Sequence, residues 1–309
     1  MATVLVTGGT GLIGRHLSHL LLQKGYSIII LTRKKPGHAT PNITYAEWDV
    51  SRGLIDKDAV MKSDYIIHLA GAGVADERWS AKRKQEIVDS RVKSSELLVK
   101  TLQENQHHVK ATVSASGIGW YGGDNDASRV KGFTEEAEPD KDFLGETCRL
   151  WEQSIEPVQS SGIRLVKMRT GLVLSNDGGA LAEFKKPLKF GIAGILGGGD
   201  QVMSWIHIDD ICRMYLYALQ NEQVSGAYNA VAPTPVTNKE LTLQTARTMR
   251  GKRFIPIYVP SFVLKLILGE MSIEVLKSAT VSDSKIRATG FRFLYPSLEA
   301  ALNELLRNK

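Results

Sequence analysis

The stretch VLVTGGTGLIGR, residues 4–15, decides the fold. Residues 4–7 form an apolar run that is too short for a helix, so we expect a buried strand. Three glycines follow at a spacing of three (Gly8, Gly11 and Gly14), and an amphipathic helical pattern begins directly after them. A strand, a glycine-rich turn and a helix in this order are the context that the dinucleotide-binding fingerprint requires.

Each glycine has a physical role in such a site. Gly8 and Gly11 permit a tight turn and a close approach of the backbone to a pyrophosphate, and Gly14 lets the helix lie against the strand. The free N–H groups and the positive end of the helix favour an anion there. The residues expected to contact the cofactor in this segment are Gly8, Thr10, Gly11, Leu12, Ile13 and Gly14.

Composition narrows the class of protein. The chain has 309 residues, 43% hydrophobic and 23% charged, with a net charge of +6, which is typical of a globular enzyme that attracts anionic ligands. Neither a nucleic-acid motif nor a membrane-spanning stretch is recognisable. Cys148 and Cys212 fit no metal or redox spacing, so we expect reduced thiols, no metal and a cytoplasmic protein. The sequence leaves open whether the chain forms a homo-oligomer.

Short apolar runs alternate with helix-length segments along the first half of the chain. This alternation predicts an α/β fold with a doubly wound parallel sheet. We expect a Rossmann core in residues 1–175, with returns to the sheet up to about residue 235, and a smaller substrate lobe in residues 176–309. Expected strands are 4–7, 27–32, 43–48, 65–69, 112–116 and 164–169; expected helices are 15–24, 81–103, 211–219, 238–250 and 297–307; residues 194–199 are expected to form a loop.

The residue after the second strand predicts which cofactor is bound. A site selective for NAD usually has an acidic residue here, but this chain has Arg33, followed by Lys34 and Lys35. A guanidinium can pair with a 2′-phosphate and stack on adenine, so the sequence favours NADP(H). Arg15 is a further candidate phosphate contact.

Two later strand ends supply further cofactor candidates. Asp49 follows the third strand and either lies beside the adenine ring or caps a turn. The small residues of Leu69-Ala70-Gly71 let the backbone approach the cofactor. His68, directly before them, is expected to form local hydrogen bonds rather than to act as an acid or a base.

The chain resembles the extended short-chain dehydrogenase/reductase superfamily through residues 7–14 (TGGTGLIG) and 68–71 (HLAG). It resembles more narrowly an atypical epimerase-like branch labelled "cell division inhibitor" proteins, which has a small C-terminal domain. The motifs that carry the narrower resemblance are WYG (120–122), RTGLVL (169–174), SWIHIDD (204–210), NAVAP (229–233), LGEM (268–271) and ATGFRF (288–293).

The superfamily resemblance implies a catalytic serine, tyrosine and lysine. Ser116 best matches the serine that holds the substrate oxygen, and Ser114 is the next candidate. Counting back from the family's glutamate landmark, here Glu152, places Leu144 and Cys148 where the tyrosine and the lysine belong. Neither side chain can replace these groups, so we expect atypical chemistry.

Other side chains are candidates for the missing functions. Tyr121 either donates a proton or is a packing aromatic, and Glu146 is either an acid–base group or a surface carboxylate.

Trp205 and His207 are candidate substrate contacts. The spacing of His207 and Asp209 allows both to face a pocket, but Asp209 and Asp210 can equally cap the following helix. Arg169 is a candidate for a buried ion pair.

Two functions remain. The first is an NADP(H)-dependent reductase or epimerase-like enzyme acting on an unidentified small molecule. The second is an NADP(H)-binding sensor or regulatory protein without hydride transfer.

Overall fold

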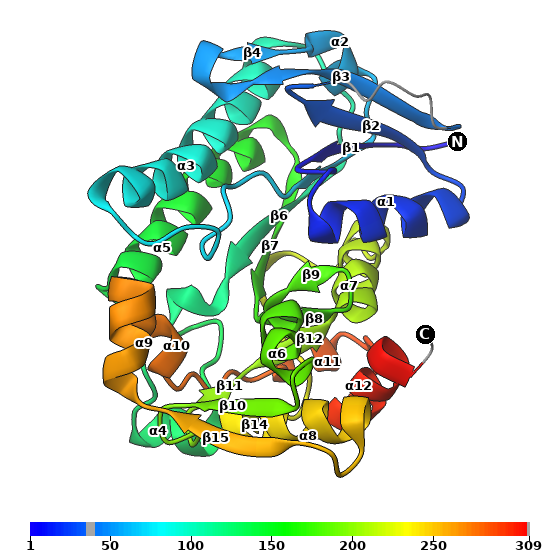
Figure 1. Cartoon of the computed structure of the whole chain (residues 1–309). Helices are drawn as coiled ribbons and strands as arrows, with labels where there is room; N and C mark the ends of the chain where they lie inside the picture. Colours follow the sequence, from blue (N-terminus) through cyan, green and yellow to red (C-terminus); the bar gives the residue numbers. More distant parts are fainter. Residues whose placement is uncertain (35–40, 308–309) are drawn as a thin grey trace.

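A single eight-stranded sheet organises the chain in this computed structural model, which describes residues 1–34 and 41–307 (Figure 1). The strands occur in the order β13-β7-β6-β5-β1-β2-β3-β4, and all pair in parallel except β4, which is antiparallel to β3. Their bounds are β1 (Thr3–Thr7), β2 (Ser27–Thr32), β3 (Ile43–Asp49), β4 (Leu54–Ile55), β5 (Tyr65–His68), β6 (Ala111–Gly117), β7 (Arg164–Thr170) and β13 (Gly226–Ala230).

The central strands are apolar because helices cover both faces of the sheet. Side chains alternate along a strand, so in β1 Val4 and Val6 join one core cluster while Leu5 joins another. Helices α1 (Leu12–Gln23) and α7 (Ile208–Gln220) contribute to the first cluster. Helices α3 (Ala81–Glu104) and α5 (Phe143–Ile155) pack against each other, and both contribute to the second.

The strand order confirms the doubly wound fold. The chain proceeds outward from β1 through β2 to β3, then returns to β5 on the other side of β1 and proceeds through β6 to β7. The direction therefore reverses between β1 and β5. Ligands of open parallel sheets bind at this reversal point, beyond the carboxyl ends of the strands.

A smaller lobe follows β7, but the chain returns to the main sheet through β13. Residues 194–199, expected to be a loop, are in part a strand: β10 (Ile192–Leu196) pairs in parallel with β15 (Ile255–Val259), so this expectation was wrong. The remaining strands are β8 (Leu172–Ser175), β9 (Gly178–Gly179), β11 (Val202–Met203), β12 (Trp205–His207) and β14 (Val236–Thr237). The remaining helices are α2 (Lys57–Met61), α4 (Asp126–Lys131), α6 (Ala180–Leu188), α8 (Asn238–Arg250), α9 (Ser261–Leu268), α10 (Ser272–Leu276), α11 (Ser284–Ala288) and α12 (Leu298–Arg307).

Polar contacts fix the lobe against the helices of the sheet. Lys84 of α3 forms an ion pair with Glu270. Lys277 Nζ lies 2.5 Å from Asp142 Oδ2, at the start of α5. These pairs hold the 270–277 segment close to the amino-terminal ends of α3 and α5. Within the described residues, we find no helix that is both long and apolar enough to span a bilayer.

A substitution at Gly14 tests whether the close approach of α1 to the glycine-rich turn after β1 is needed for stability. A Cβ atom at this position would overlap the carbonyl oxygen of Gly8 and crowd the backbone of Gly9. We predict that Gly14→Ala lowers the free energy of unfolding by about 1–3 kcal/mol through overpacking, measured by denaturant titration. The matched control is Gly123→Ala, whose Cβ would meet its nearest neighbour at 3.7 Å. Equal stability of the two variants would show that the close approach is dispensable.

Candidate cofactor and substrate site

The glycine-rich turn has the geometry of an anion-binding loop. Gly8 has a φ of +67°, and a Cβ there would lie 2.7 Å from the carbonyl oxygen of Leu69. Gly11 is the N-cap of α1, and its own N–H donates to Gly8 O over 3.0 Å. The cap has no side-chain hydrogen bond, and the first turn has no acidic residue. The free N–H groups of this turn are therefore available to a phosphate.

The hydroxyl of Thr7 joins the ends of β1 and β5. Its oxygen accepts hydrogen bonds from the N–H groups of Leu69 and Ala70, each over 3.1 Å, and lies 2.8 Å from His68 Nδ1. Because the oxygen already accepts two hydrogen bonds, we assign its single proton to the hydrogen bond with Nδ1, so Thr7 is the donor. This interaction places the backbone of Leu69, Ala70 and Gly71 beside the glycine-rich turn.

His68 has a structural role, as expected. It is completely buried, its Nε2 lies 3.1 Å from Ser95 Oγ, and burial lowers the pKa of its imidazole to about 4. The ring is therefore neutral at pH 7, with its proton on Nε2, and both ring nitrogens are engaged by neighbouring hydroxyl groups.

The cofactor-selectivity candidates lie at the ends of β2 and β3. Arg33 and Lys34 are exposed, whereas Lys35 falls outside the described residues. Arg15 is also exposed and donates to Thr10 O over 2.8 Å. Asp49 caps the short 3-10 helix that follows β3, accepting from the N–H groups of Ser51 and Arg52, so the capping alternative is confirmed for this residue.

Ser116 belongs to a buried ionic network at the end of β6. Its hydroxyl donates to Glu152 Oε1 over 2.8 Å. Arg169 donates to both oxygens of Glu152, over 2.8 and 3.1 Å, and Lys167 Nζ lies 3.3 Å from Oε2. Arg169 thus forms the expected buried ion pair. Because the proton of Ser116 is directed to Glu152, its oxygen has lone pairs left to accept a hydrogen bond from a ligand.

Tyr121 lies on the other side of Arg169. Its hydroxyl donates to Asn229 Oδ1 over 2.7 Å and accepts from Arg169 Nη1 over 3.1 Å, and its ring stacks on Phe133. The side chain is 1% exposed, and burial raises the pKa of the phenol to about 12. These contacts are those of a packing aromatic with a satisfied hydroxyl.

The helix α5 presents Leu144 and Cys148 to the carboxyl end of β6. A Cβ on Gly119 would lie 3.0 Å from Leu144 Cβ, and Cys148 Sγ would lie 3.7 Å from a Cβ on Gly117. Burial raises the pKa of the Cys148 thiol to about 11, so this group stays protonated at pH 7. Glu146 is exposed and paired with Arg149, which lowers the pKa of its carboxyl group and makes it a surface carboxylate.

Trp205 and His207 are completely buried. Trp205 Nε1 donates to Thr234 O over 2.9 Å. His207, not an aspartate, is the N-cap of α7: its Nδ1 accepts from the N–H of Asp209 over 3.1 Å. Neither side chain is open to a substrate in this arrangement.

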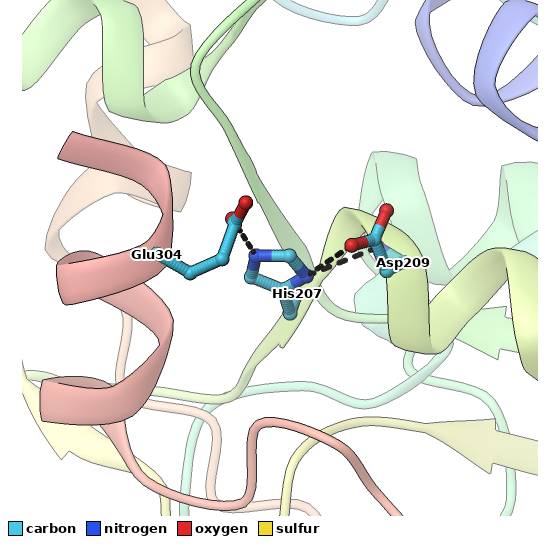
Figure 2. Close-up of side chains that lie close together, drawn as sticks. All are labelled: His207, Asp209 and Glu304. Atoms are coloured by element: carbon cyan, nitrogen blue, oxygen red, sulfur yellow. Dashed lines mark hydrogen bonds and ion pairs between the residues drawn. The ribbon is translucent and has the colours of Figure 1, made fainter. Parts of the chain in front are cut away.

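His207, Asp209 and Glu304 place potential metal ligands within 4.8 Å of one another (Figure 2). However, Nδ1 of His207 accepts from a peptide N–H, so its proton lies on Nε2, which is 3.0 Å from Glu304 Oε2. Both ring nitrogens have protein partners. The geometry is that of a helix cap at the start of α7 and a hydrogen bond from the neutral imidazole to Glu304 of α12.

Sequence reasoning missed the polar side of α3. Ser90 Oγ accepts from Ala72 N over 2.9 Å, and Arg91 and Arg83 donate to the carbonyl oxygens of Ala72 and Gly73. The detectable signal was a set of polar residues at helical spacing on the buried side of α3.

The fold and the glycine-rich turn define a nucleotide-binding protein of the doubly wound α/β class. The chain belongs to the NAD dependent epimerase/dehydratase family, whose model matches residues 4–230. Residues 259–305 match a second family model, a domain of unknown function (DUF1731). These matches confirm the resemblance to the extended short-chain dehydrogenases/reductases.

Relatives cover the whole chain. The epimerase family protein YfhF of Bacillus subtilis is 36% identical, over 99% of this chain and 98% of its own length. A structure of the human epimerase family protein SDR39U1 (isoform 2) with NADPH aligns with a TM-score of 0.86 and 30% identity, covering 99% of this chain and 100% of the human chain. A nucleoside-diphosphate sugar epimerase from Corynebacterium glutamicum aligns with a TM-score of 0.77 and 31% identity, covering 99% of this chain and 58% of that chain.

The buried neutral state of His68 predicts a pH dependence of stability. The folded pKa of about 4 lies below the ordinary value of 6.5, so the unfolded chain takes up the proton first as pH falls. We predict no effect above pH 6.5 and a progressive loss between pH 6.5 and 4, reaching roughly 3 kcal/mol. Denaturant titrations across this range measure it.

The control for that prediction is His68→Asn. Its amide oxygen can still accept from Thr7, but the side chain does not titrate. We expect a shallower pH dependence than in the wild type. Identical slopes for the two proteins would show that His68 does not carry the effect.

Proposed function

We propose that the protein is an NADP(H)-binding, epimerase- or reductase-like enzyme acting on a small substrate. The observation that carries this proposal is the open amino-terminal end of α1 behind Gly8 and Gly11, next to the loop that Thr7 holds in place. The NADPH in the structure of the similar human protein supports the same cofactor here.

The choice of NADP(H) over NAD(H) rests on the end of β2. Arg33 and Lys34 are exposed there, and no hydrogen bond or ion pair ties the Arg33 side chain to any other residue that the structure describes. An exposed guanidinium at this position is available to a 2′-phosphate.

We predict that Arg33→Ala weakens NADPH binding about tenfold, corresponding to about 1.5 kcal/mol for a charge-assisted hydrogen bond, with little effect on NADH. Calorimetric titration of both cofactors measures the selectivity. Arg129→Ala, which removes an exposed arginine from α4, is the control for net charge. An equal loss for both cofactors would mean that Arg33 does not recognise the 2′-phosphate.

Within this proposal, the protein's own groups orient the substrate more than they exchange protons with it. NADPH, when bound, supplies the hydride. Ser116 accepts a hydrogen bond from a substrate hydroxyl, because its own proton is held by Glu152. Tyr121 is buried and its hydroxyl proton is already donated to Asn229, so a water molecule at the site delivers the proton in this proposal.

The second candidate is an NADP(H)-binding sensor without hydride transfer. The placement of Leu144 and Cys148 at the end of β6 favours it, because neither side chain exchanges a proton at pH 7. A sensor binds the cofactor tightly but leaves it unoxidised whatever carbonyl compound is offered.

Turnover separates the two candidates. We predict substrate-dependent NADPH oxidation across a panel of aldehydes, ketones and keto sugars, at least tenfold lower in Ser116→Ala and within a few-fold of wild type in Tyr121→Phe. Absorbance at the nicotinamide band follows the reaction. An inert panel with intact NADPH binding favours the sensor, whereas unchanged turnover in Ser116→Ala removes Ser116 from the mechanism.

A further inference from the structure

Arg91 is a buried cation on the inner side of α3. Its side chain is held among α3, α5 and the segment that follows β5, and the residue is 8% exposed. Nη1 donates to Ala72 O over 3.0 Å and to Ile87 O over 2.9 Å, and the guanidinium lies over the ring of Trp151, 4.8 Å from its centroid. The side chain is therefore fixed in place.

The charge of Arg91 has no acidic partner among the residues that the structure describes. Within residues 1–34 and 41–307, no carboxylate lies within ion-pair distance of its guanidinium. Arg83, two turns earlier on the same side of α3, is by contrast paired with Glu86 and Asp76. The nearby thiol of Cys148 is protonated at pH 7 and supplies no negative charge. An unpaired buried charge is costly, so a compensating anion is favoured here.

Part of the guanidinium is free to bind. An arginine has five N–H donors, and the two carbonyl contacts use both donors of Nη1. Nε and Nη2 have no hydrogen-bond partner among the described residues. Both atoms are accessible to solvent. This edge of the side chain presents donors in the fork geometry that matches a phosphate or a carboxylate.

The free fork lies at the edge of the sheet where a ligand is expected. A Cβ on Gly71, directly after β5, would be 3.1 Å from Arg91 Cζ. Cys148, which lies near Arg91, packs against Gly117 at the end of β6 and against Gly119 just beyond it. Arg91 thus lies by the carboxyl ends of β5 and β6, next to the reversal point of the sheet.

We propose that Arg91 is an oxyanion-binding residue, which takes a phosphate or a carboxylate at the carboxyl ends of β5 and β6. This inference rests on the proposed function, because the oxyanion is either the diphosphate of the cofactor or an acidic group of the substrate. In the second case the substrate is a small carboxylate or phosphate ester.

A purely structural arginine in this protein has a different pattern. Arg164, at the amino end of β7, donates to the carbonyl oxygens of Ala218, Leu219 and Val224. No ion pair joins Arg164 to a carboxylate within the part of the chain that the structure describes, and its donors are directed to the backbone. Arg164→Gln is therefore the matched control for removing a half-buried arginine without removing the proposed oxyanion site.

The test compares the wild type with Arg91→Gln and Arg91→Lys. Gln keeps an N–H donor for Ala72 but loses the charge, and Lys keeps the charge but loses the fork. Binding of NADPH and of adenosine 2′,5′-bisphosphate, which has the 2′-phosphate but no diphosphate, is measured by calorimetry. Stabilisation of the NADPH-loaded protein by inorganic phosphate and by oxalate is measured by thermal denaturation.

Two results support the proposal and distinguish the sources. If the cofactor supplies the oxyanion, Arg91→Gln weakens NADPH binding about tenfold or more and leaves the bisphosphate unchanged. If the substrate supplies it, NADPH binding is unchanged, and phosphate or oxalate stabilises the wild type but not Arg91→Gln. In both cases Arg91→Lys retains part of the effect.

Three results overturn it. These are unchanged binding of all probes in Arg91→Gln, the same losses in Arg164→Gln, and equal losses in Arg91→Gln and Arg91→Lys. A wild type that binds neither NADPH nor the bisphosphate contradicts the proposed function instead. The phosphate and oxalate measurements on the cofactor-free chain then still decide the role of Arg91.

Discussion

The site depends on one hydroxyl group, that of Thr7. It accepts hydrogen bonds from the N–H groups of Leu69 and Ala70 and donates one to His68. These bonds join the ends of β1 and β5, the two strands between which the sheet reverses direction. Gly8 is needed for the same reason, because a Cβ atom at this position would collide with the carbonyl oxygen of Leu69. On the other side of the loop, Ser90 and Arg91 of α3 hold Ala72. The cofactor loop is thus held from both sides by polar contacts.

Much of the fold could be predicted from the sequence. Strands β1, β2 and β5 are short apolar runs because both faces of the sheet are covered, and the expected bounds agree with the structure to within a residue. The three glycines identified the β1–α1 turn because steric constraints there are local. In contrast, part of β10 was predicted to be a loop. Its partner β15 begins about sixty residues later, and the local sequence does not indicate this pairing.

The candidate site was predicted less completely. The sequence identified Ser116, Tyr121 and Arg169, but it did not reveal that Glu152 connects them in one network, directly or through Arg169. The sequence predicted helix α3 itself, but not that its buried side includes Arg83, Arg91, Ser94 and Ser95. Burial of an arginine depends on carbonyl and aromatic partners from other elements, which periodicity does not show. His207 was a candidate substrate contact but is completely buried, because period-two spacing does not distinguish a pocket from the core.

The central claim is that this chain binds NADP(H) at the β1–α1 turn. Native mass spectrometry of the purified protein, with and without added NADPH, tests it most directly. We predict one bound NADP(H) per chain, either retained through purification or acquired on addition, and lost when the Gly8 turn is blocked by Gly8→Val. A chain that stays free of cofactor at saturating NADPH would contradict the account and leave a Rossmann fold without its nucleotide.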